Sequence, residues 1–262
     1  MNLDRHMLGP SAPPDDLETP LVMNHVTLVC LPFAGAGASV FSPWRRLRKD
    51  LDVRALQLPG RENLIDDKPC TTISAATNAL ADELAGKVAG GDVVLFGHSL
   101  GAILAFELAR RIEADGHYTL RQLLVSGSAD PWSVRVDRAT GLSDDEFVAQ
   151  VRKLAGYDHP ALSDPELREL ILPTLRADVE MHEAYRAEPA ARISAPITAV
   201  LGAEDALVSA DQASGWKDAT SSSFELASTP GGHMYLTEDP PAAFEVVGGL
   251  IDTAHGRQRR TG

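Results

Sequence analysis

A serine stands between two glycines in the segment GHSLG at residues 97–101, directly after the apolar run VVLF at 93–96. A continuous apolar run of this kind is typical of a strand buried on both faces, and a helical pattern follows it without a linker. Glycine at positions 97 and 101 removes the Cβ atoms that would clash in such a tight turn. We therefore expect the hydroxyl of Ser99 to project above a sheet edge, where it could act as a nucleophile.

A serine hydroxyl needs an imidazole to accept its proton and a carboxylate to orient that imidazole. Asp205 follows the predicted strand ITAVLG, at the strand's carboxyl end, where active-site loops of doubly wound sheets gather. His233 lies in the glycine-rich segment TPGGHMYL, after the next predicted strand. The order serine, acid, histidine is that of α/β-hydrolases. The sequence therefore predicts a triad of Ser99, Asp205 and His233.

Other side chains remain open for the same roles. Glu204 and Asp211 are the competing acids, and the position just after the strand favours Asp205, with Glu204 second. His98 adjoins the serine and cannot easily reach the same side of its hydroxyl, which favours His233 as the base. The remaining competitors are the scattered histidines His117, His159 and His182.

The tetrahedral intermediate of acyl transfer also needs hydrogen-bond donors for its oxyanion. We expect one donor to be the backbone amide of Leu100, at the N-terminus of the helix that follows the serine. The second is expected from the small-residue segment LPFAGAGAS, with the amide of Ala34 favoured. Gly35 and Gly37 are not followed by a glycine at position 40, so this segment is not a GxGxxG nucleotide loop.

The fold class predicted is α/β, with a mostly parallel sheet covered by helices on both faces, and the order of the triad residues suits an α/β-hydrolase fold. Between two sheet strands, residues 131–192 carry helical patterns without a convincing strand and are interpreted as a helical insertion. A chain of 262 residues suits one such domain over 25–255, between flexible tails at 1–24 and 256–262. Strands are predicted near 25–33, 52–58, 92–97, 121–127, 196–202 and 223–228, and helices near 39–50, 73–88, 100–115 and 241–254.

Composition excludes several function classes. A net charge of −13 disfavours binding to a nucleic-acid backbone. No segment has the apolar core of a secretion signal or the length of a membrane span. Cys30 and Cys70 form no CxxC pair, so a reducing cytoplasm is expected. HEAYR at 182–186 has arginine where a zinc motif needs its second histidine, so it is interpreted as lid helix, and neither a metal nor a cofactor is predicted.

Five segments occur in order along nearly the whole chain: LPFAGAGASVFSPW, LQLPGRE, GHSLG, GAEDALV and GGHMYL. Together they resemble the type II thioesterases of polyketide and nonribosomal peptide synthesis. The resemblance implies an α/β-hydrolase core with a helical lid, the triad Ser99, Asp205 and His233, and oxyanion amides at Ala34 and Leu100. It also implies hydrolysis of acyl groups from the phosphopantetheine thiol of acyl or peptidyl carrier proteins, which clears stalled or mis-primed chains. GGHMYL is less aromatic than the resemblance leads one to expect.

Two alternatives stay open at this point. One is another serine hydrolase or acyltransferase acting on small esters or amides, because the fold alone does not separate these activities. The other is a noncatalytic carrier-binding protein, which an active-site-directed fluorophosphonate would leave unlabelled at Ser99.

The lid and one charged cluster offer candidate contacts with substrate and partner. If the lid covers Ser99, its apolar side chains line the acyl site, and the candidates are Leu154, Leu170, Leu175 and Met181. A helix over WRRLRKD would place Arg45, Arg48 and Lys49 on one face, as a docking patch for an acidic carrier protein or as an ordinary solvated surface.

Overall fold

The computed structural model describes residues 26–49, 51–134, 137–155 and 162–261, and the side chains of these residues apart from 154–155 and 254–261. Six strands form one sheet in the order β2-β1-β3-β4-β5-β6, and every neighbouring pair is parallel. Their bounds are β1 Thr27–Leu31, β2 Asp52–Ala55, β3 Gly91–His98, β4 Tyr118–Ser126, β5 Ile197–Gly202 and β6 Phe224–Thr229. All six predicted strands are present, and the predicted α/β fold class is confirmed.

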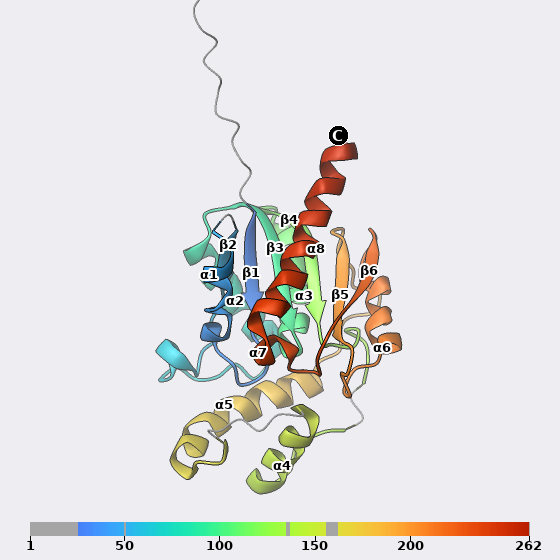
Figure 1. Ribbon diagram of the computed structural model, residues 1–262. Coiled ribbons are helices and arrows are strands. Elements are labelled where there is room, and N and C mark those ends of the chain that lie inside the picture. Colours follow the sequence, from blue (N-terminus) through green and yellow to red (C-terminus); the bar gives the residue numbers. More distant parts are fainter. Residues whose placement is uncertain (1–25, 50, 135–136, 156–161, 262) are drawn as a thin grey trace, which may run out of the picture.

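Helices cover both faces of this sheet (Figure 1). On one face, alternate strand residues such as Val29 and Leu95 pack against α2 Ile73–Lys87 and α3 Leu100–Asp115. On the other face, residues such as Leu28 and Phe96 pack against Trp44 and α8 Pro240–Thr261. Because successive strand side chains point to opposite faces, the apolar runs seen in the sequence supply two cores at once.

Shorter elements complete the domain. They are the 3-10 turns η1 Ala38–Phe41, η2 Glu62–Leu64 and η4 Gly215–Ala219, and the short helices α1 Trp44–Leu47, α6 Ala210–Ser214 and α7 Tyr235–Glu238. None of the described helices combines the length and apolar character needed to cross a bilayer.

The insertion between β4 and β5 contains two helices, α4 Asp144–Ala155 and α5 Pro165–Ala184. They have a small core of their own, which includes Phe147 and Leu172. Asp164 caps α5 by accepting hydrogen bonds from the amides of residues 166 and 167, with Pro165 at the first helical position. In Figure 1 these helices lie beyond the end of the sheet at which the parallel strands finish, so the predicted lid faces the carboxyl edge.

Two helix predictions were wrong in extent. The segment predicted as a helix over 39–50 forms η1 and the four-residue α1, and Arg48 has an extended backbone (φ −135°, ψ 122°). Pro43 lacks the N–H that would continue the first turn, and Trp44 is fully buried among aromatic rings. The expected helical face carrying Arg45, Arg48 and Lys49 therefore does not form.

The last helix also departs from its prediction. It was expected to end at residue 254, with a flexible tail from 256, but α8 continues to Thr261. Its last turns contain arginine and glutamine, which are good helix formers, and arginine is favourable near the C-terminus of a helix. The predicted tail at 1–24 lies outside the described residues.

Candidate active site

Ser99 occupies the tight turn between β3 and α3. Its backbone has φ 53° and ψ −116°, and its amide donates a hydrogen bond to the Ser126 carbonyl at 2.8 Å. A Cβ atom at Gly97 would lie 2.0 Å from the Gly101 carbonyl oxygen, and one at Gly101 would lie 2.3 Å from the Leu31 carbonyl oxygen. Only glycine fits at either position, so the turn that presents Ser99 depends on both.

An acid and a histidine meet at the same edge of the sheet. Asp205 follows β5 and His233 follows β6, and His233 Nδ1 lies 2.9 Å from Asp205 Oδ2. Asp205 Oδ1 accepts hydrogen bonds from the amides of Leu207 and Val208 at 2.8 and 3.1 Å. Burial raises the pKa of the Asp205 carboxyl, but the hydrogen bond and charge of His233 and the two amides outweigh it and lower that pKa below its ordinary value. The carboxylate can therefore orient the imidazole and stabilise its protonated form.

The competing acids lie elsewhere. Glu204 is exposed and accepts a hydrogen bond from the Gly231 amide at 2.6 Å, and Asp211 lies in the first turn of α6. His233 thus contacts Asp205, and Glu204 serves the glycine turn that precedes the histidine. His159 lies outside the described residues.

His98 is buried directly behind this site. Its ring centroid lies 5.0 Å from that of His233, and its Nδ1 lies 2.9 Å from Ser126 Oγ, which in turn lies 2.7 Å from the Tyr235 hydroxyl. Burial, followed by the charge of His233, lowers the pKa of His98 well below its ordinary value. His98 is therefore a neutral packing partner of His233 at neutral pH.

The loop after β1 is held by side chains from other segments. Three of its amides donate to side-chain oxygens: Gly35 to Asp178 Oδ2 at 2.8 Å, Ala38 to Gln57 Oε1 at 2.6 Å, and Ser39 to Glu62 Oε1 at 3.1 Å. The amides of residues 36 and 40 donate to carbonyl oxygens within the loop. Within the described part of the chain, the amides of Phe33, Ala34 and Gly37 are left without an acceptor in this loop. Leu100 is the first residue of α3, where an amide has no carbonyl partner one turn earlier.

A cavity of about 210 Å³ lies beside His233. Ile103, Leu207 and Val208 contribute apolar walls from the hydrolase core. The insertion contributes further side chains, which are Val134, His182, Tyr185 and Arg186. The described part of the lid therefore does contact the space next to the histidine.

The lid residues predicted as acyl-site walls are not brought together there. Leu175 packs in the lid core and against Gly35, and Met181 is buried against the sheet-side core. Leu170 is 54% exposed. The side chain of Leu154 lies outside the described part of the chain. His182 and Glu183 lie in α5, as the interpretation of HEAYR required.

Sequence reasoning missed the polar residues that support this site. The signal for Asp178 was an acidic residue among the apolar positions 172, 175 and 181 of one helix, where a lone charge implies a buried partner. The partner, Arg61, lies in LQLPGRE, a segment recognised by resemblance but given no role.

Comparison with known proteins identifies the family. A thioesterase domain model matches residues 26–251. "Probable cadicidin biosynthesis thioesterase" of Streptomyces griseus is 34% identical over 220 residues, which make up 84% of this chain but only 60% of that protein's length. RedJ, a thioesterase from the prodiginine biosynthetic pathway in Streptomyces coelicolor, is a structural neighbour with 32% identity and a TM-score of 0.77, covering 94% of this chain and 90% of its own. The type II thioesterase BorB from the borrelidin biosynthetic cluster has 37% identity and a TM-score of 0.76, covering 87% and 93%. The chain therefore belongs to the thioesterase domain family.

Proposed function

We propose that this chain is a type II thioesterase that hydrolyses acyl groups from the phosphopantetheine thiol of acyl or peptidyl carrier proteins, removing aberrant or stalled chains from a biosynthetic synthase. The observation that carries the proposal is the 2.9 Å contact between His233 and the buried carboxylate of Asp205, at the same sheet edge where a strained turn presents Ser99. RedJ and BorB, which are named as thioesterases of biosynthetic pathways, support the choice of thioester over ester.

The chemistry follows from these positions. Ser99 Oγ attacks the thioester carbonyl while His233 accepts its proton, and Asp205 stabilises the imidazolium. The amides of Ala34 and Leu100 donate to the oxyanion of the tetrahedral intermediate. When the intermediate collapses, the carbon–sulfur bond breaks and the thiol takes the proton from His233. Water then attacks the acyl-enzyme by the same route and releases the acid and Ser99.

The compartment and the acyl site belong to the same proposal. Cys30 and Cys70 are both free thiols, which suits a reducing cytoplasm. The 210 Å³ cavity beside His233 is the acyl site, with Ile103, Val134 and Tyr185 among its walls.

The test measures thiol release from an acyl-pantetheine thioester and from an acyl-carrier protein. We expect wild-type turnover of both, none above background for Ser99→Ala, and labelling of Ser99 by a fluorophosphonate. Asp205→Asn is expected to lose about 10⁴ in rate, as loss of the orienting acid does in serine proteases. Glu204→Gln is the matched control and should stay near wild type, because that side chain binds the Gly231 amide.

The outcomes separate the competing functions. Faster hydrolysis of the matched oxoester would favour a general esterase, and absence of labelling would favour a noncatalytic carrier-binding role. A large loss for Glu204→Gln with a near-normal Asp205→Asn would move the acid to residue 204.

A further inference from the structure

A buried ion pair joins the lid helix to the loop after β2. Arg61 Nη1 donates to Asp178 Oδ2 at 2.6 Å, and Arg61 Nη2 donates to Asp178 Oδ1 at 2.9 Å. Their side chains are only 6% and 1% exposed. A bidentate pair in this environment is rigid, because moving either partner would leave the other charge buried without compensation.

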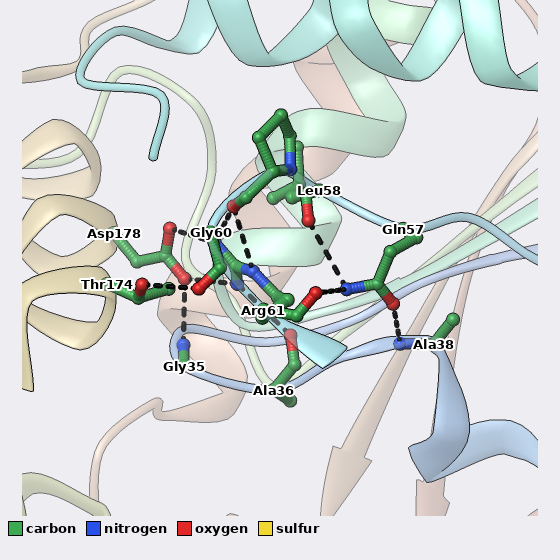
Figure 2. Close-up of polar contacts among 10 residues, drawn as sticks. Gly35, Ala36, Ala38, Gln57, Leu58, Gly60, Arg61, Thr174 and Asp178 are labelled. Atoms are coloured by element: carbon green, nitrogen blue, oxygen red, sulfur yellow. Dashed lines mark hydrogen bonds and ion pairs between the residues drawn. The ribbon is translucent and has the colours of Figure 1, made fainter. Parts of the chain in front are cut away.

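The same pair holds the loop that carries Ala34. Asp178 Oδ2 also accepts the Gly35 amide at 2.8 Å, and Arg61 Nη1 also donates to the Ala36 carbonyl at 3.1 Å. Figure 2 shows these contacts converging between the lid helix and the loop after β1. The peptide unit that follows Ala34 is thereby fixed by a residue of the lid.

The lid helix also rests directly on both loops. Gly35 has φ +76°, a conformation that favours glycine, and a Cβ atom there would lie 2.9 Å from Leu175 Cδ1, so this residue packs directly against α5. Thr174 Oγ1 donates to the Gly60 carbonyl at 2.7 Å, next to Arg61 (Figure 2). Residues 174, 175 and 178 form one face of α5, and this face contacts the loops after β1 and β2 together.

We propose that Asp178 and Arg61 are positioning residues for the oxyanion hole. Through them, the seating of lid helix α5 sets the orientation of the Ala34 amide. Since the Gly35 amide is committed to Asp178, its peptide plane cannot rotate, and the neighbouring Ala34 amide stays available for the substrate oxygen. A lid displaced from these loops would leave Ser99 and His233 in place but would release the donor. This inference rests on the proposed function.

The experiment compares two buried acids on the same helix. Asp178→Asn turns one carboxylate oxygen into an NH₂ group, which must face donors from Arg61 or Gly35. Glu183→Gln is the matched control, because Glu183 is 2% exposed and accepts the amides of residues 139 and 140 within the insertion itself. Both variants are expected to lower the melting temperature.

Only the Asp178 variant should damage transition-state binding. We expect its kcat on acyl-pantetheine to fall about tenfold to a hundredfold, with KM within about twofold of wild type. A trifluoromethyl ketone analogue, whose serine adduct places an oxyanion in the hole, should lose affinity by the same factor. A thioether analogue without a carbonyl should bind as it does to wild type, and Glu183→Gln should match wild type in all three measurements.

A double variant tests the same proposal in a protein that should remain folded even if Asp178→Asn does not. Arg61→Met with Asp178→Leu replaces the ion pair by apolar side chains, an exchange that is often neutral or stabilising. It leaves the Gly35 amide without its acceptor, so the same losses of kcat and of ketone affinity are expected in a folded protein. Wild-type kcat and ketone affinity in this folded variant would overturn the inference and leave the proposed function intact. An inactive wild type would instead refute the proposed function.

Discussion

Ser99 shows at the scale of one residue how the fold prepares a nucleophile. Its φ of 53° is unfavourable for a residue with a Cβ atom, and such conformations persist only where the surroundings over-determine them. Here the amide of Ser99 donates a hydrogen bond to the Ser126 carbonyl. Backbone atoms also lie close to Gly97 and Gly101, which restricts movement of the turn. The serine is therefore held in one orientation before any substrate binds.

The residue types around this turn were readable from the sequence for a physical reason. A nucleophile elbow needs glycines at fixed positions, and strands that end at one edge bring their following residues together, as they do for Asp205 and His233. The sequence offered no comparable rule for Asp178, because its partner lies 117 positions away in a loop. Long-range polar pairs of this kind depend on how a helix is rotated about its axis.

His98 makes stability depend on pH in a predictable direction. Its pKa in the folded protein is lowered by burial, so below the ordinary value of 6.5 the unfolded chain binds a proton that the folded chain does not. The contribution of His98 to the free energy of unfolding should therefore rise with pH up to about 6.5, with a slope of at most about 1.4 kcal/mol per pH unit, which corresponds to one proton. His98→Gln removes this component. Urea unfolding measures the difference in free energy of unfolding between the wild type and His98→Gln, and we expect this difference to become smaller from pH 7 to pH 5. A difference that does not change with pH would contradict the prediction.

At the scale of elements, the apolar pattern predicted the strands of the sheet but overestimated the length of the helix around Trp44. The central strands β1, β3 and β5 are compact apolar runs that are largely buried on both faces, which leaves little ambiguity about their place, whereas the edge strands β2 and β6 are partly exposed. The segment around Trp44 has a helical pattern too, but packing of the indole against Phe96 and Phe244 and the proline before it determine its path. The side chains predicted as acyl-site walls show the same limit: Leu170 and Leu175 do not line the cavity beside His233, whereas His182, Tyr185 and Arg186, at the end of the lid helix, do.

Tyr185, at the end of α5, lines two spaces. It lines the 210 Å³ cavity beside His233 and also a groove of about 660 Å³ between α2, α3 and the end of α5. Its hydroxyl donates a hydrogen bond to Glu107 Oε1 at 2.5 Å, and this bond fixes the position of the ring.

Removing this ring should lengthen the accepted acyl chain. We expect Tyr185→Ala to join the two spaces and shift the best substrate of an acyl-pantetheine series towards longer chains. Tyr185→Phe keeps the ring and loses only the hydrogen bond, so its preference should stay close to wild type. If Tyr185→Ala prefers the same chain length as wild type, the ring is not the end wall of the acyl site.

At the scale of the whole molecule, the parallel sheet brings the candidate functional groups to one of its ends. Ser99, Asp205, His233 and the lid gather at the carboxyl end of the strands, where the strand ends leave backbone groups and loops free for binding. The arginine-rich segment around α1 leads away from that end: Trp44 packs against Phe96, with 5.0 Å between ring centroids, and Asp52 pairs in register with Thr27, and Thr27 with Val93. From the level of Val93, six further residues lead to Ser99, a distance of about 20 Å at roughly 3.3 Å per residue.

This geometry changes the expectation for the charged cluster. Arg48 pairs with Asp252 of α8 at 2.9 Å, while Arg45 and Lys49 are exposed. None of the described side chains that line the cavity beside His233 comes from this segment, and the screening length at physiological salt is about 8 Å, so these exposed charges should act weakly on a group bound in the cavity. We expect Arg45→Glu with Lys49→Glu to change KM for an acyl-carrier protein by the same small factor as KM for acyl-pantetheine, within about twofold, at low and at high salt. A rise in KM confined to the carrier substrate and abolished by salt would instead place carrier docking on the segment around α1.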